Sequence, residues 1–80
     1  MDKDIEKYLI EIEKIIGARI ENSRIMLGMS RKELAKAINV SQQQLVKYER
    51  NKNRISVGRL ILVAKKLNKS FLYFLHDHDN

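Results

Sequence analysis

The first twenty residues carry hydrophobic side chains at the spacing of one helix face. These side chains are Ile5, Leu9, Ile12, Ile16 and Ile20. Because they recur every three or four residues, they form one stripe on a helix. Gly17 interrupts the stretch and lowers helix stability by roughly 1 kcal/mol relative to alanine. The pattern is therefore compatible with one helix over residues 3–27 and with two helical segments in contact. We favour two segments that meet near Gly17.

This stripe admits two interpretations. It can cover the core of a small bundle, or it can form a dimer or partner surface in which Ile5 and Leu9 take part. A hydrophobic stripe on a helix of a globular protein normally faces the core. We therefore favour the interpretation in which the stripe covers the core of the bundle.

A helix followed by a tight turn is predicted after residue 28. Gly28 ends the preceding helix in a left-handed conformation, and Ser30 with Glu33 forms a capping box that starts the next one. The side chains that this helix turns inward are Leu34, Ala35 and Ile38. Asn39 lies in the turn, where we expect a positive φ, which asparagine tolerates.

The helix after the turn is predicted over residues 42–50, with Ser41 as its N-cap. Leu45 and Tyr48 form its core face. Gln42 and Gln43 follow the cap directly, and Lys47 lies one turn later. A glutamine amide donates and accepts at once, so it can pair twice with adenine N6 and N7 in a major groove, whereas lysine suits guanine acceptors or phosphate. Polar runs are usually solvated helix surface, but the position after an N-cap favours base reading.

Two further helices are predicted in the last third of the chain. Ser56 caps the first, and Asn68 ends it. Its apolar stripe consists of Val57, Leu60, Ile61, Ala64 and Leu67, with Arg59, Lys65 and Lys66 facing outward.

The last predicted helix, residues 71–75, is apolar on every side. One face, with Phe71, Phe74 and Leu75, can cover the core. This leaves Leu72 and Tyr73 as candidates for a dimer or partner surface, unless the N-terminal stripe covers them.

Composition indicates one small all-α domain. The 80 residues contain no proline, no cysteine and three glycines, so little interrupts helices, and neither disulfides nor thiolate metal sites can form. Within residues 1–16, three basic and five acidic side chains give a net charge of −2. Residues 17–69 hold 13 basic and three acidic side chains, or +10. The basic part therefore favours a polyanionic partner.

Several function classes find no support in the sequence. No nucleophile with an adjacent base, glycine-rich phosphate loop or carboxylate pair is recognisable, so we expect neither an enzyme nor a cofactor. The alternating residues His76, Asp77, His78 and Asp79 are metal-ligand types, but a terminal tail does not hold four ligands in fixed geometry, so we expect no metal. No apolar run long enough to span a bilayer and no signal peptide are present, which makes a cytoplasmic location without membrane contact the expectation.

Several segments match one known family in order and spacing. They are Ile16-Gly17-Ala18-Arg19-Ile20, Arg24, Gly28-Met29-Ser30, Glu33-Leu34-Ala35, Val40-Ser41-Gln42, Leu45, Tyr48-Glu49-Arg50 and Leu60 to Leu67. On the basis of these segments, residues 16–75 resemble the Cro/XRE-type helix-turn-helix domain of lambdoid phage repressors and bacterial regulators. The resemblance implies a compact five-helix bundle that binds operator DNA as a symmetric dimer. Residues 1–15 are then an N-terminal helical extension, and residues 76–80 a flexible tail.

The resemblance also implies roles for single residues. Gln42, Gln43 and Lys47 take the base-reading positions, and Arg24 and Glu49 match a salt bridge between the first helix and the recognition helix. The positions that touch the DNA backbone are Arg31, Ser41, Gln44, Asn51, Lys52, Asn53 and Arg54.

Two positions depart from the family pattern. Asn39 replaces a turn glycine, and Arg31 replaces a glutamine that contacts phosphate and the neighbouring glutamine. We expect Arg31 to keep the phosphate contact and to lose the contact with the neighbouring glutamine, which changes the support of Gln42 at the start of the recognition helix.

The sequence therefore predicts a sequence-specific double-stranded DNA-binding regulator, a repressor acting as a homodimer. The alternative is an antitoxin-like module that uses the same fold to bind a protein partner, with DNA binding secondary.

Overall fold

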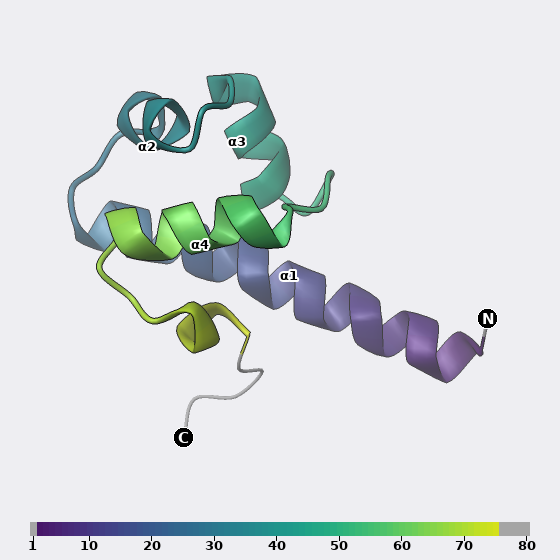
Figure 1. Cartoon of the computed structure of the whole chain (residues 1–80). Helices are drawn as coiled ribbons and strands as arrows, with labels where there is room; N and C mark the ends of the chain where they lie inside the picture. The colour runs from purple at the N-terminus through teal and green to yellow at the C-terminus, as the bar shows by residue number, and fades with distance from the viewer. Residues whose placement is uncertain (1, 76–80) are drawn as a thin grey trace.

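Four α-helices and one short 3-10 helix follow one another in the computed structural model, which describes residues 2–75 (Figure 1). They are α1 (Lys3–Met26), α2 (Arg31–Ala37), α3 (Gln42–Glu49), α4 (Val57–Lys66) and the 3-10 helix η1 (Phe71–Phe74). The described residues contain no strand, which confirms the all-α class, with η1 as the fifth helix. The predicted tail, residues 76–80, lies outside the described part.

The helix starts follow from serine caps that the sequence predicts. The hydroxyl oxygens of Ser30, Ser41 and Ser56 each accept a hydrogen bond from the backbone N–H three residues later in the chain, at 3.0–3.1 Å. Ser30 and Glu33 form the complete capping box, in which the Ser30 N–H donates to the Glu33 carboxylate at 3.0 Å. This hydrogen bond favours the charged carboxylate and lowers the pKa of Glu33.

The helix ends use left-handed residues. Gly28 has φ 69° and Asn39 has φ 60°, as predicted. Asn51 and Asn68 adopt the same conformation after α3 and α4, with φ 59° and 57°. Asparagine thus supplies three of the four left-handed residues among those described, in a chain with few glycines.

The core lies where α1, α2, α3, α4 and η1 meet. Its buried side chains are Ile20, Leu34, Ala35, Ile38, Leu45, Leu60, Val63, Ala64, Leu67 and Phe74. This confirms the inward faces predicted for α2 and α3, with Tyr48 half-buried against the core. Among the described residues, no helix has the length and apolar character to cross a membrane.

The predicted face of α4 needs correction. Val57 and Ile61 are 66% and 41% exposed, whereas Val63 is fully buried. The buried face follows the helical spacing of Leu60, Val63, Ala64 and Leu67, so Ile61 lies about 100° away from Leu60. Val57 lies in the first turn of α4, on the exposed side. Arg59 does not face outward either, because its Nε donates to the carbonyl of Ile38 at 3.2 Å.

The expectation that α1 breaks near Gly17 is wrong. Lys3–Met26 form one continuous helix, and Gly17 is buried where α3 crosses it. A Cβ at this position would lie 2.6 Å from the carbonyl oxygen of Tyr48 and 2.9 Å from that of Glu49. The glycine serves close packing of two helices and not a kink, and the resulting contact sets where the end of α3 lies on α1.

The N-terminal part of α1 extends beyond the bundle, so the predicted core cover holds for Ile16 and Ile20 and not for Ile5 and Leu9. Figure 1 shows this part of the helix, in purple, running past the other elements. Ile5 is 55% and Leu9 is 38% exposed, while Ile20 on the same stripe is fully buried. Residues 3–15, hereafter the arm, thus carry apolar side chains that the bundle does not cover.

The C-terminal segment closes the bundle opposite α2 and α3. Phe74 is buried, and Leu72 is 60% exposed, as expected for a surface residue. Tyr73, in contrast to the prediction, is not free for a dimer or partner surface, because it is half-buried. Arg19 Nη1 donates to its carbonyl at 2.6 Å, and the Lys69 ammonium lies 4.7 Å from its ring centroid. Of the two candidate surface residues in η1, only Leu72 is freely exposed.

The Gly17 contact yields a stability prediction. Gly17→Ala should lower the free energy of unfolding by roughly 1–3 kcal/mol, because the new methyl group meets backbone and cannot be accommodated by a side-chain rotation. Gly58→Ala is the matched control, since its Cβ would meet nothing within 4 Å, and helix propensity should raise stability by up to about 1 kcal/mol. Urea unfolding followed by circular dichroism measures both, and a stabilised Gly17→Ala variant would contradict the packing role.

Candidate nucleic-acid interface

Helices α2 and α3 form a helix-turn-helix in which α3 presents a polar outer face. Leu45 and Glu49 are buried, and Gln43 and Lys47 are exposed. Because residues four apart lie one above the other and residues two apart lie on opposite sides, Gln43 and Lys47 face away from the core together. The geometry therefore brings these two predicted base-reading side chains onto one outward surface.

The first turn of α3 is also accessible. Gln42 is exposed, and Gln44 is half-buried. The Ser41 hydroxyl oxygen accepts a hydrogen bond from the Gln44 N–H at 3.0 Å. The hydroxyl hydrogen of Ser41 stays available to donate. Gln42 lies on the side of Glu49 on the helical wheel, about 100° from Gln43, so it is accessible at the helix start but is not part of the Gln43 and Lys47 face.

A polar loop follows α3. Lys52, Asn53 and Arg54 are exposed, and Asn51 is half-buried with a positive φ. The Lys52 N–H donates to the carbonyl of Lys47 at 2.7 Å, so the loop folds back onto the end of the recognition helix. Arg54 Nε donates to Glu13 of α1 at 2.8 Å, although the Arg54 side chain is 77% exposed. The predicted phosphate-binding loop thus lies beside the arm.

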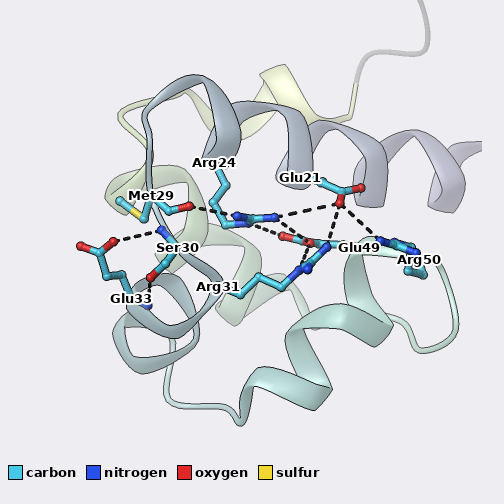
Figure 2. A network of polar contacts seen from close by, with 8 residues as sticks. All are labelled: Glu21, Arg24, Met29, Ser30, Arg31, Glu33, Glu49 and Arg50. Atoms are coloured by element: carbon cyan, nitrogen blue, oxygen red, sulfur yellow. Dashed lines mark hydrogen bonds and ion pairs between the residues drawn. The ribbon is translucent and has the colours of Figure 1, made fainter.

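A buried carboxylate holds α3 in place. Arg24 Nε donates to Glu49 Oε2 at 2.8 Å, and Arg24 Nη1 donates to the carbonyl of Met29 at 2.9 Å (Figure 2). The side chain of Glu49 is fully buried and that of Arg24 is 8% exposed. The predicted ion pair between the first helix and the recognition helix is therefore present, and it also fixes the turn before α2.

Arg31 joins the same network. Its Nε donates to Glu49 Oε1 at 2.9 Å and its Nη2 to Glu21 Oε2 at 2.8 Å (Figure 2). The hydrogen bond with Glu49 is the main cause that raises the pKa of Arg31. The sequence led us to expect a phosphate contact here. In the structure the guanidinium points toward two carboxylates, and its side chain stays 32% exposed.

Glu21 is the residue that the sequence reasoning missed. It pairs with Arg31 and lies 3.7 Å from Arg50 and 4.0 Å from Arg24. Only three acidic residues occur within residues 17–69, and one of them, Glu33, caps α2. The scarcity of acids in this basic segment was a usable signal that the other two, Glu21 and Glu49, bind arginines.

The network also redistributes the charge. Arg24, Arg31 and Arg50 share the carboxylates of Glu21 and Glu49. Lys47 and Lys52 have no ion pair among those in the described residues. The cations with no acidic partner near α3 are consequently lysines at its outer face and following loop.

Known proteins are similar to this chain in sequence and fold. A family model described as Helix-turn-helix matches residues 20–74. An HTH-type transcriptional regulator of Rickettsia conorii is 48% identical over 64 residues, which cover 80% of this chain and 51% of that protein. A transcriptional regulator in the ATPase CF(0) region of Rhodospirillum rubrum is 41% identical over 77 residues, 96% of this chain and 71% of that protein.

Two solved structures have a similar fold. The clp gene regulator ClgR from Corynebacterium glutamicum superimposes with a TM-score of 0.76 at 29% identity, covering 82% of this chain and 86% of that one. The regulator of biofilm formation SinR, solved in complex with DNA, superimposes with a TM-score of 0.70 at 34% identity. The match covers 76% of this chain and 98% of the SinR chain. The chain spans about half the length of the first curated relatives it matches.

The buried network yields a second prediction. Glu49→Gln should lower the free energy of unfolding by roughly 3–5 kcal/mol, because it removes the charge that compensates a nearly buried guanidinium. Glu13→Gln is the matched control. It removes an ion pair with the exposed Arg54, and exposed pairs contribute roughly 0–1 kcal/mol. Chemical unfolding measures both, and equal losses would contradict a special role for the buried carboxylate.

Proposed function

The chain belongs to the Cro/XRE-type helix-turn-helix family of DNA-binding transcriptional regulators, and on that premise we propose that it is a repressor that binds a palindromic DNA site as a homodimer. The observation that carries the proposal is the outer face of α3, where Gln43 and Lys47 lie opposite the buried Leu45 and Glu49. That its structural neighbour SinR was solved in complex with DNA supports duplex DNA as the ligand.

In the proposed complex, the exposed face of α3 enters the major groove. Gln43 and Lys47 read base edges, and Gln42 reads at the start of the helix. A bidentate amide contact contributes roughly 1–3 kcal/mol of discrimination against a wrong base. Two copies would place their α3 helices in successive major grooves, about 34 Å apart.

The contacts that position the protein on the backbone come from both ends of α3. Ser41 caps the helix, Gln44 lies in its first turn, and Asn51, Lys52, Asn53 and Arg54 follow it. Such contacts fix orientation without reading sequence. Lys52 has no acidic partner among the ion pairs of residues 2–75, so it is the cation most available for phosphate.

Arg31 acts differently in this proposal. A guanidinium has five N–H donors, and Arg31 uses two of them for Glu49 and Glu21. The remaining donors can still reach phosphate, but the main effect is to hold the start of α2 and the end of α3 together. Arg31 therefore orients Gln42 through the helices and not by touching its amide.

A protein-interaction module is the second candidate. The exposed apolar side chains of the arm and of Leu72 favour it. Size-exclusion chromatography of the chain with and without duplex DNA at low salt separates the two candidates, because failure to bind any duplex would favour the module.

Base reading and backbone binding can be separated by matched variants. After selection of bound sites from a random duplex library, Gln43→Ala should bind the selected site about 1–3 kcal/mol more weakly, with little change on random DNA. Lys52→Ala should weaken binding to both and reduce the salt slope by about one unit.

Lys7→Ala is the control for general charge, since Lys7 is exposed on the arm and should leave both affinities unchanged. Fluorescence anisotropy over a salt series measures all three variants. Equal losses from Gln43→Ala on selected and random DNA would exclude base reading by Gln43.

A further inference from the structure

The exposed part of the apolar stripe on α1 has no partner within the described chain. We define the N-terminal stripe as Ile5, Leu9, Ile12 and Ile16. Ile5 and Leu9 are 55% and 38% exposed, and Ile12 and Ile16 are half-buried. The charged residues of the arm lie at other positions of the helical wheel. The stripe is thus apolar along its length, exposed at Ile5 and Leu9 where the helix extends beyond its own bundle (Figure 1), and covered in part at Ile16, which packs against the core.

We propose that the N-terminal stripe pairs antiparallel with the same stripe of a second copy, and that this pair of helices is the dimer interface. The inference rests on the proposed function in one respect, since a palindromic site requires two copies related by a two-fold axis. It assigns that contact to the arm and not to Leu72.

The spacing of the stripe supports a helix pair. Intervals of four, three and four residues correspond to the a and d positions of a heptad, which form the seam between two packed helices. In an antiparallel pair centred between residues 10 and 11, Ile5 lies opposite Ile16 of the second copy and Leu9 opposite Ile12 of the second copy. Ile5, Leu9 and Ile12 then meet an apolar partner, and Ile16, which packs against its own core, offers only its exposed part to Ile5 of the second copy.

The dimensions of this pair set the separation of the two bundles. Ile20, at the centre of the bundle core, lies about nine residues from the two-fold axis, or roughly 14 Å along the helix. The two bundles are therefore separated by about 28 Å along the helices and 8–10 Å across them, a total of about 30 Å. This distance separates the bundle cores; the points at which α3 crosses α1, at Gly17, lie roughly 20 Å apart along the helices.

The orientation of α3 selects the antiparallel pairing. Gly17, which contacts α3, lies about 110° around α1 from the middle of the stripe. The two-fold axis of an antiparallel pair is perpendicular to the plane of the two helices, so both α3 helices lie on the same side of that plane. A parallel pair has its axis along the helices and would turn the two α3 helices to opposite sides, where one duplex cannot meet both.

Charge along the edge of the stripe is compatible with this pairing. Glu6 and Glu13 lie on one flank, and antiparallel packing brings Glu6 toward Glu13 of the second copy. Glu13 already binds Arg54 at 2.8 Å, which neutralises it and offsets the repulsion between the two carboxylates.

Oligomeric state tests the interface. Sedimentation velocity of the full chain should show a dimer, and Leu9→Glu should weaken self-association by roughly a hundredfold or more, since a charge at the seam is desolvated. Ile10→Glu is the matched control, because Ile10 is 44% exposed on another side of α1, and Leu72→Glu tests the rival surface. Both controls should stay dimeric, and circular dichroism should show that all variants are folded.

A chain that is monomeric at every concentration would overturn the proposal, because another occupant would then have to cover the stripe. Dissociation by Leu72→Glu with an intact dimer in Leu9→Glu would overturn it in favour of η1.

Cross-linking tests the antiparallel register, because the chain has no cysteine of its own. A mixture of Ile5→Cys and Ile16→Cys chains should form a disulfide-linked heterodimer, since the two Cβ atoms face each other. Ile5→Cys alone should not cross-link, because its two copies are about 16 Å apart along the pair. Efficient cross-linking of Ile5→Cys alone would indicate parallel helices and exclude the proposed pairing.

DNA binding separates this inference from the proposed function. Leu9→Glu should retain binding to single half-sites at low salt but lose roughly tenfold or more in affinity for the full palindrome. A stripe-dependent dimer that binds no duplex would refute the DNA-binding proposal and leave the interface standing. Full-site affinity unchanged in Leu9→Glu would refute the role of the arm in operator binding.

Discussion

The carboxylate of Glu49 is the group on which the position of the recognition helix depends. It is the last residue of α3, it is fully buried, and it accepts hydrogen bonds from Arg24 of α1 and Arg31 of α2. Three consecutive helices are therefore joined at one charged group. A buried carboxylate without these partners would be strongly destabilising, so the arrangement of α1, α2 and α3 is fixed by the need to keep all three side chains together.

This network and the Gly17 contact act at the same place. Gly17 brings the carbonyls of Tyr48 and Glu49 against α1, and the arginines then bind the side chain of Glu49. Close backbone approach and charge pairing together leave the end of α3 little freedom to move. The exposed face with Gln43 and Lys47 is consequently presented on a rigid support, which base reading requires.

The local features of this fold could be predicted from the sequence, and the tertiary ones could not. Serine caps, the capping box of Ser30 and Glu33, and the left-handed Asn39 depend on neighbours within a few residues. The continuity of α1 through Gly17 depends on a helix about 30 residues away, and the direction of Arg31 depends on Glu21 and Glu49 in two other helices. The outer face of α3 was predictable because helical periodicity separates it from Leu45.

The continuity of α1 has a mechanical consequence. The same rod that carries the arm also seats α3, so the direction of the arm and the direction of the reading surface are locked to each other. Deleting one residue between Ile12 and Gly17 would turn the arm by about 100° relative to α3, whereas inserting seven would restore its direction and lengthen it by about 10 Å. With the proposed pairing, the length of the arm sets the distance between the two half-sites. Only changes of about seven residues alter that distance while keeping the stripe pointed in the same direction.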